Sequence, residues 1–239
     1  MTGAARGIGL ATAHALAADG WPVALNCRNA EDGEAAVSAI NEVGGHAVLA
    51  LGDVTHDSAV EAIFAELEQQ FGFVGVLVNN AGISSGGPVT GIDWDPVIDT
   101  NLAAPFRIIR RALPGMMRKR FGRVINISSV LAARSIPGVS SYAVAKSGLD
   151  ALTRSVAIEV AGRGITVNSV APGIVGTEMT TALPHFEKSV RAGVPMRRAA
   201  APEEIASAVA YLASPAAAYV TGVTLPVDGG ISASAFRIP

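Results

Sequence analysis

The sequence predicts an α/β protein with one parallel, doubly wound sheet and helices on both faces of that sheet. Short runs of β-branched residues alternate with helical patterns along the chain, and this alternation is typical of parallel strands joined by crossover helices. Half of the 239 residues are apolar, which is enough for one large core. No linker, repeat or low-complexity tract interrupts the pattern, so residues 1–239 are predicted to form a single domain.

The expected strands are short β-branched runs bounded by turn-forming residues. They span residues 23–26, 47–51, 74–79, 123–127, 165–170 and 223–227. Helices are expected where apolar residues recur at helical spacing, near 7–19, 31–43, 57–71, 96–119, 141–162 and 202–213. The last helix opens with Pro202, Glu203 and Glu204, which places a proline in the first turn and acids at the positive end of the helix dipole.

Composition excludes several classes of protein. The formal net charge is −2 and the basic residues are scattered, which argues against nucleic-acid binding. One cysteine, Cys27, excludes an internal disulfide, and the four histidines show no ligand spacing, so no metal site is expected. No apolar run approaches the ~20 residues of a membrane span. Residues 6–18 resemble a signal peptide but fit a phosphate-binding loop and its helix better, so a cytoplasmic protein is expected.

A glycine-rich segment, Thr2-Gly3-Ala4-Ala5-Arg6-Gly7-Ile8-Gly9, opens the chain. Glycines let the backbone turn tightly and approach a pyrophosphate, whose charge is stabilised at the N-terminus of the following helix. The same pattern also suits a tight turn with no ligand. The next strand ends at Arg28, where sites for NAD usually carry an acid. Arg28 and Arg6 suit the 2′-phosphate of NADP instead, unless Arg28 is simply a solvated residue at the strand end.

Polar or glycine-containing segments follow four further strands: Gly52-Asp53-Val54, Asn79-Asn80-Ala81-Gly82, Ser128-Ser129 and Pro172-Gly173 with Thr177. Ligands of open α/β sheets bind at the carboxyl ends of the strands, so these segments predict one binding rim. Asp53 has two interpretations, a bond to the adenine amino group or a cap for the helix near residue 57. A turn built on asparagine and glycine is the alternative for the second segment.

Tyr142 and Lys146 are four residues apart in an expected helix, and Ser129 lies thirteen positions upstream of the tyrosine. Side chains at i and i+4 share one face of a helix. A tyrosine alone, with a pKa of about 10, is a poor acid or base at neutral pH, but a nearby cation favours its anion. The pair can therefore act as one acid–base unit.

Together these motifs resemble the short-chain dehydrogenases/reductases, most closely the branch with the bacterial 3-oxoacyl-[acyl-carrier-protein] reductases. The resemblance runs from Thr2 to about Gly230 and includes the tail from Tyr219 to Gly230. It implies a Rossmann-like fold and a homotetramer that pairs the helices near 96–119 and 141–162. It also implies that two arginines, Arg120 and Arg163, dock an acyl carrier protein near the cleft, although both also fit structural roles.

The resemblance assigns roles to individual residues. Tyr142 is expected to protonate the substrate oxygen, Ser129 to orient the carbonyl, Lys146 to lower the tyrosine pKa and hold the nicotinamide ribose, and Asn101 to anchor a proton-relay water. NADP(H) is expected in preference to NAD(H). The residues expected to bind it are Gly3, Arg6, Gly7, Ile8, Gly9, Arg28, Asp53, Val54, Asn79, Ala81, Gly82, Tyr142, Lys146, Pro172, Gly173, Ile174 and Thr177.

One departure from the family concerns the first strand. In the family about six apolar residues precede the threonine of the glycine loop, whereas here Met1 precedes Thr2. The first strand is therefore expected to be missing from the sheet, because of a truncated or misassigned start or because the chain fills the gap in another way. Two neighbouring strands would then lack a hydrogen-bonding partner, which would weaken stability and cofactor binding.

The leading hypothesis is an NADPH-dependent carbonyl reductase acting on a 3-oxoacyl thioester or a similar ketone. An alcohol, sugar or steroid-type dehydrogenase is the enzymatic alternative, and a non-catalytic dinucleotide sensor or scaffold is the alternative of another class. Residues 84–87, 136–140 and an irregular lid over 174–200 are expected to form the substrate pocket. Leu183, Phe186 and Val190 of the lid are candidates to cover an acyl chain, or else to pack at an interface.

Overall fold

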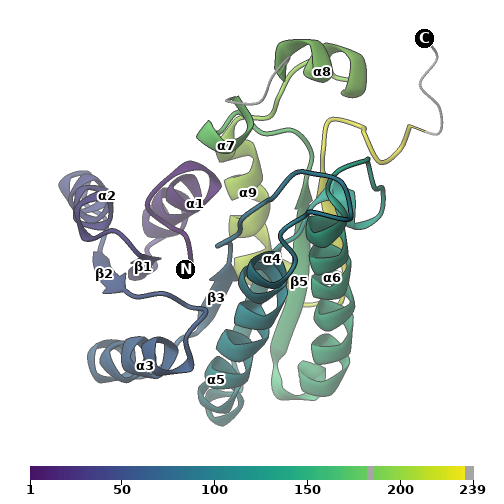
Figure 1. Cartoon of the computed structure of the whole chain (residues 1–239). Helices are drawn as coiled ribbons and strands as arrows, with labels where there is room; N and C mark the ends of the chain where they lie inside the picture. Colours follow the sequence, from purple (N-terminus) through teal and green to yellow (C-terminus); the bar gives the residue numbers. More distant parts are fainter. Residues whose placement is uncertain (182–185, 235–239) are drawn as a thin grey trace.

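The computed structural model describes residues 1–181 and 186–234 (Figure 1). The strands are β1 Val23–Cys27, β2 Ala47–Leu51, β3 Val76–Asn79, β4 Gly122–Ile127, β5 Ile165–Pro172 and β6 Thr224–Val227. Both ends of each strand lie within two residues of the expected boundaries. The predicted α/β class is confirmed.

The longer helices also follow the sequence pattern: α1 Gly7–Ala18, α2 Ala30–Glu42, α3 Asp57–Phe71, α5 Ala104–Lys119, α6 Ser140–Val160 and α9 Pro202–Ala213. The single helix expected over 96–119 is wrong in one respect. It consists of a short helix, α4 Asp95–Ile98, a π-helical turn, η1 Asp99–Ala103, and α5. Local π-helical turns are frequent at functional sites.

The lid over 174–200 is more regular than the sequence indicates. It contains α7 Glu178–Thr181 and α8 Phe186–Gly193, while Leu183 and Pro184 lie outside the described residues. Val190 is buried. A parallel bridge between Val175 and Ala200 joins the two ends of the lid.

All strand pairings are parallel, but the described strands form two separate sheets. One has the order β3-β4-β5-β6 and the other pairs β1 with β2. The division lies between β1 and β3, which is the place in the sheet where the sequence predicts that a strand is missing. Figure 1 shows β1 and β2 with α2 at one side of the molecule, apart from β3 and β5.

The first residues of the chain join the two sheets. Thr2 forms a parallel bridge with Asn26, and its amide donates to the Val78 carbonyl at 3.0 Å. The Asn26 amide donates to the Met1 carbonyl at 2.9 Å, and the Met1 amino group donates to the Ala24 carbonyl at 2.9 Å. This segment therefore connects β1 with β3 near their carboxyl ends and fixes the start of the glycine loop between them.

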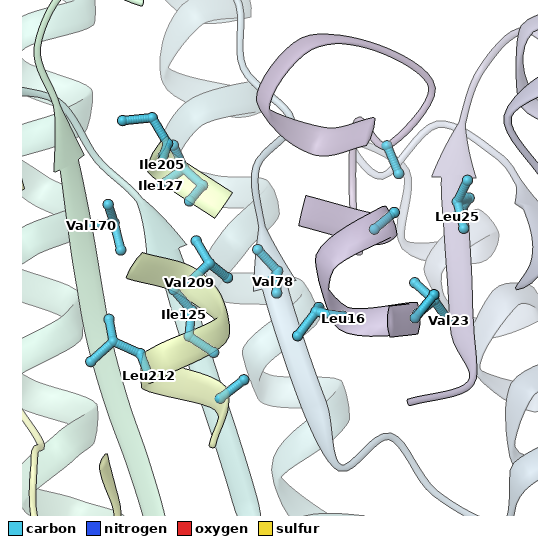
Figure 2. Close-up of a cluster of buried hydrophobic side chains, with 14 of the residues drawn as sticks. Leu16, Val23, Leu25, Val78, Ile125, Ile127, Val170, Ile205, Val209 and Leu212 are labelled. Carbon is cyan, nitrogen blue, oxygen red and sulfur yellow. The ribbon is translucent and has the colours of Figure 1, made fainter. Parts of the chain in front are cut away.

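One apolar core continues across the division (Figure 2). Leu16 of α1 lies between Leu25 of β1 and Val78 of β3, and all three are buried. Val209 and other buried residues of α9 cover the same face of the larger sheet. Packing of α1 and α9 thus maintains the layer of helices where hydrogen bonding between strands is interrupted.

The opposite face is covered by α3, α5 and α6. Its core contains Phe64, Ile108, Met116 and Val156 beside the inward residues of β4 and β5. Helices on both faces make the fold doubly wound. The strand order changes direction between β1 and β3, and such switch points are where ligands bind in folds of this class.

A buried polar network lies inside this second core. The side-chain amide of Asn79 donates to Asn126 Oδ1 at 2.8 Å, and the side-chain amide of Asn126 donates to Thr153 Oγ1 at 2.8 Å. Thr153 Oγ1 also lies 2.8 Å from Ser169 Oγ. The network joins β3, β4 and β5 to α6, the helix that carries Tyr142 and Lys146, so polar contacts as well as apolar ones hold this helix against the sheet.

Candidate active site

A cavity of about 480 Å³ lies at the carboxyl ends of the strands and across the switch point. Most of the sequence-predicted residues line it. They are Gly3, Arg6, Gly7, Ile8, Gly9, Arg28, Asp53, Val54, Ala81, Gly82, Ser129, Tyr142, Lys146, Pro172, Gly173 and Thr177. The polar segments that follow separate strands in the sequence are therefore brought to one rim.

The glycine loop forms one end of this cavity. It approaches the β3 side so closely that a Cβ on Gly3 would lie 2.9 Å from the Ala81 Cα. Gly7, at the start of α1, has a φ of 54°, a conformation that favours glycine. The N-cap residue, Arg6, makes no side-chain capping bond, so the N-terminus of α1 is available to an anionic group. This geometry fits a pyrophosphate.

Arg28 and Asp53 face each other where β1 and β2 end. Arg28 Nη1 lies 3.8 Å from Asp53 Oδ2, and the arginine side chain is 74% exposed, which leaves its other donors available. Asp53 Oδ1 accepts from the amide and the hydroxyl of Thr55. It therefore forms a local turn, and α3 begins after His56 without a side-chain cap. The Thr55 amide holds the pKa of the Asp53 carboxyl below its usual range, against the effect of burial.

Tyr142 lies in the first turns of α6 and lines the cavity together with Ser129, which follows β4. Burial raises the pKa of Tyr142, and the nearby Ser129 side chain opposes that rise. Ser129 Oγ accepts from the Leu131 amide at 3.1 Å, which fixes its position. Ser129 therefore lines the cavity with the tyrosine, while Ser128 Oγ is buried without a partner in the described chain.

Lys146 is buried beside this pair. Its Nζ lies 5.6 Å from the centroid of the Tyr142 ring and donates to the Ile127 carbonyl at 2.7 Å. Burial lowers the lysine pKa to about 8, and the Asp150 carboxylate opposes this shift. Burial raises the Tyr142 pKa and Lys146 is not among the groups that shift it, so a lowering of that pKa by Lys146 stays a prediction. A cation close to the phenol nevertheless stabilises the anion that forms as its proton leaves.

Asn101 is held on the π-helical turn behind the cavity wall. Its amide donates to the carbonyls of Ile83 and Val97, both at 2.8 Å. Its Oδ1 is buried without a partner among the described residues. A Cβ on Gly82 would lie 2.7 Å from that oxygen and 3.6 Å from Lys146 Nζ, so Gly82 permits the close packing of these two groups. The unpaired Oδ1 is suited to bind a water beside the lysine.

Two further predicted cofactor residues do not line the cavity. Asn79 is buried, with its amide engaged by Asn126. Ile174 lies beside the lining, where its carbonyl accepts from the Ala200 amide. Neighbours on the same segments, Asn80 and Val175, line the cavity in their place.

Other lining residues have no counterpart in the sequence prediction. Asn29 caps α2 by accepting from the amides of Glu31 and Asp32 at its N-terminus. The pattern of a polar strand end followed by a helix was a usable signal for it. Glu178 of α7 pairs with Arg6 at 3.0 Å across the mouth of the cavity. Nothing local in the sequence indicates that pair, because its members are 172 positions apart.

Within residues 1–181 and 186–234, no group of three or more acidic, histidine or cysteine residues is placed to hold a metal ion. The helices of the same described part are all too short or too polar to cross a membrane.

Three features define an oxidoreductase that uses a nicotinamide dinucleotide. They are the glycine loop at the N-terminus of α1, the cavity across the switch point, and the cluster of Ser129, Tyr142 and Lys146. A family model described as enoyl-(acyl carrier protein) reductase matches residues 3–232. The chain belongs to the short-chain dehydrogenase/reductase family.

Two bacterial 3-oxoacyl-[acyl-carrier-protein] reductases are among its relatives. The one from Vibrio cholerae is 43% identical over 235 residues, which cover 97% of this chain and 95% of the relative. The one from Escherichia coli K12 is 42% identical with the same coverage. A solved structure from Agrobacterium tumefaciens, assigned provisionally as a gluconate dehydrogenase, is 36% identical, with a TM-score of 0.95 over 98% of this chain and 94% of that one.

Proposed function

We propose that the protein is an NADPH-dependent carbonyl reductase and that its substrate is a 3-oxoacyl thioester. The observation that carries the proposal is the Tyr142 side chain, which lines the cavity together with Ser129 and lies beside the buried Lys146 ammonium. This arrangement offers two hydroxyl groups to one carbonyl oxygen. The names of the two reductases support the substrate class.

In this proposal, bound NADPH supplies the hydride that is added to the carbonyl carbon. Ser129 donates a hydrogen bond that orients the carbonyl oxygen, and Tyr142 transfers its proton to that oxygen as the alcohol forms. Lys146 stabilises the resulting phenolate. A water on Asn101 Oδ1 completes a path for returning the proton. The exposed guanidiniums of Arg28 and Arg6 favour the 2′-phosphate of NADPH.

The proposal is tested by initial rates with NADPH and NADH across acetoacetyl thioesters, simple ketones, polyketide-like diketones and sugar acids. We expect the highest kcat/KM for the acetoacetyl thioester with NADPH, and a preference over NADH of about 10–100-fold, because a charged hydrogen bond contributes about 1.5–3 kcal/mol. A clear preference for NADH would contradict the cofactor assignment. Cofactor binding without turnover of any substrate would favour a non-catalytic role.

A second candidate is a dehydrogenase that oxidises an alcohol or a sugar acid. It is favoured by the likeness to the provisional gluconate dehydrogenase. The same residues catalyse the reverse reaction, with Tyr142 as the base. Oxidation of gluconate faster than reduction of every ketone in the panel would establish this alternative.

We infer that the protein is a cytoplasmic homotetramer. Exposed apolar side chains on α5 and α6 support subunit contacts through these helices: Phe106 and Val144 are each 47% exposed, and Ile158 is 83% exposed. Such residues on neighbouring helices favour burial against another copy.

Docking of an acyl carrier protein by Arg120 and Arg163 remains a proposal, and it requires a second subunit. Arg120 Nη2 donates to the Gly162 carbonyl at 3.3 Å, so the two arginine segments are adjacent. They precede β4 and β5, however, and therefore lie at the opposite edge of the sheet from Tyr142. A neighbouring subunit with antiparallel α5 and α6 would bring its own arginines toward this active site.

The double variant Arg120→Ala/Arg163→Ala should therefore lower kcat/KM for a carrier-bound substrate by about tenfold, and high salt should reduce the wild-type rate similarly, because exposed charges are screened. The rate with a small free thioester serves as the control and should not change. Equal rates of the double variant and the wild type on carrier-bound substrate would remove the docking proposal.

A further inference from the structure

Asp150 is a buried acid that the proposed reaction does not yet use. It lies on α6, one helical turn beyond Lys146, and exposes 9% of its surface. Its Oδ1 is buried without a hydrogen-bond partner in the described chain. An ionised carboxylate taken out of water is unfavourable unless a nearby group compensates its charge. The helix that carries the catalytic pair therefore holds a negative charge that needs a partner.

Of the two cations four residues from Asp150 on α6, Arg154 is exposed to water, and Lys146 is the buried one placed to compensate this charge. Residues four positions apart on a helix lie on one face, and Lys146 is itself 4% exposed. Its ammonium contacts the Ile127 carbonyl, a neutral acceptor that does not balance the positive charge. Burial lowers the pKa of Lys146, and attraction by Asp150 is the effect that raises it.

No competing charge is evident on the described elements packed against this part of α6. On α4, Asp95 is exposed. On η1, Asp99 is engaged by Arg107 of α5 at 2.8 Å. The 3-10 helix η2 (Val130–Ala132) and β5 carry no charged side chain, and the one on β4, Arg123, is at the amino end of that strand. On α6 itself, Arg154 lies four residues beyond Asp150 but is exposed to solvent, and Tyr142 is the titratable neighbour of Lys146 within the site.

We propose that Asp150 is a positioning residue for carbonyl reduction, whose buried carboxylate keeps the Lys146 ammonium charged and directed at Tyr142. The proposal rests on the proposed function in one respect, that Tyr142 delivers a proton during the reaction. A charged Lys146 then stabilises the phenolate. Without Asp150, the ammonium loses its proton at a lower pH, and the phenolate forms without its cation.

Asp150→Asn tests this proposal, because it removes the charge and keeps the shape. We expect the basic limb of the kcat/KM profile to move down by roughly one pH unit. The rate should then stay within about twofold of wild type at pH 6 and fall about fivefold at pH 8. Asp150→Glu should restore most of the loss. Glu159→Gln, which removes an exposed acid from the same helix, should leave the limb unchanged.

A second measurement does not depend on turnover. The chain has lysines at 119, 146 and 188, so ¹³Cε-lysine NMR gives few signals, and Lys146→Met assigns the one from Lys146. Its titration midpoint should fall by about one pH unit in Asp150→Asn, even if no ketone proves to be a substrate. If Asp150→Asn does not fold, Asp150→Ser replaces it in both experiments.

An unchanged midpoint in the neutral variant would overturn the proposal. So would a loss of rate that is equal at pH 6 and pH 8, because a purely structural role predicts a loss independent of pH. Failure of the ketone panel together with a shifted midpoint would count against the proposed function and leave the role of Asp150 intact.

Discussion

Lys146→Met is expected to abolish carbonyl reduction while making the folded protein more stable. The ammonium is buried, and burial lowers its pKa from 10.5 to about 8. At pH 7 the folded state therefore carries a charge that the unfolded chain accommodates more easily. This pKa already includes the attraction between Lys146 and Asp150, so, allowing also for the lost bond to Ile127, methionine should raise the free energy of unfolding by roughly 1–3 kcal/mol. The rate should fall by about 10²–10⁴-fold, as expected when an acid–base group loses its partner.

The sign of this effect gives the variant a characteristic pH dependence. Between pH 8 and pH 10.5 the unfolded chain binds more protons at this lysine than the folded chain does, so wild-type stability gains with rising pH in that window. Lys146→Met lacks this contribution. Denaturant unfolding at pH 7 and pH 9.5 should show a larger difference between the two proteins at pH 7. Lys119→Met removes an exposed ammonium and should change stability by less than about 0.5 kcal/mol. A destabilised Lys146→Met at pH 7 would contradict the prediction.

Tyr142→Phe should reduce kcat by about 10²–10⁴-fold with little effect on dinucleotide binding. The variant removes the proton donor and keeps the ring that lies beside Lys146. Ser129 would still accept from the Leu131 amide and remain in place. Steady-state rates and NADPH fluorescence titration separate the two effects. Tyr211→Phe, on an exposed residue of α9, is the matched control and should retain full activity. A rate within tenfold of wild type would exclude Tyr142 as the proton donor.

Much of the fold follows from local sequence patterns. The strands are predicted well because buried parallel strands are short, continuous β-branched runs between turn residues. The π-helical turn at Asp99–Ala103 could not be predicted from the sequence. The side-chain amide of Asn101, in the middle of this turn, donates to the carbonyls of Ile83 and Val97. One of these lies in a loop that only the folded chain brings near.

The sequence predicts which segments form the site, but it does not predict which side chains of those segments face the cavity. Strand ends indicate which segments reach the rim, but neighbouring residues there point in different directions. Asn79 was expected in the cofactor site, yet its side chain is in the buried network, and Asn80 lines the cavity. Asp150 had no sequence signal, because an acid on a helix is usually exposed. Its burial becomes apparent only once α6 is packed against its neighbours.

The hydrogen-bonded contact between α6 and the sheet limits how this helix can slide. Apolar side chains can interdigitate in several registers, whereas the bonds from Asn126 to Thr153 and from Thr153 to Ser169 are made in one alignment. A shift of α6 by one turn would move Tyr142 and Lys146 by about 5.4 Å and leave these buried groups unpaired. The polar contacts in the core beneath the active site therefore set the axial position of the proton donor, Tyr142, relative to Ser129 after the end of β4.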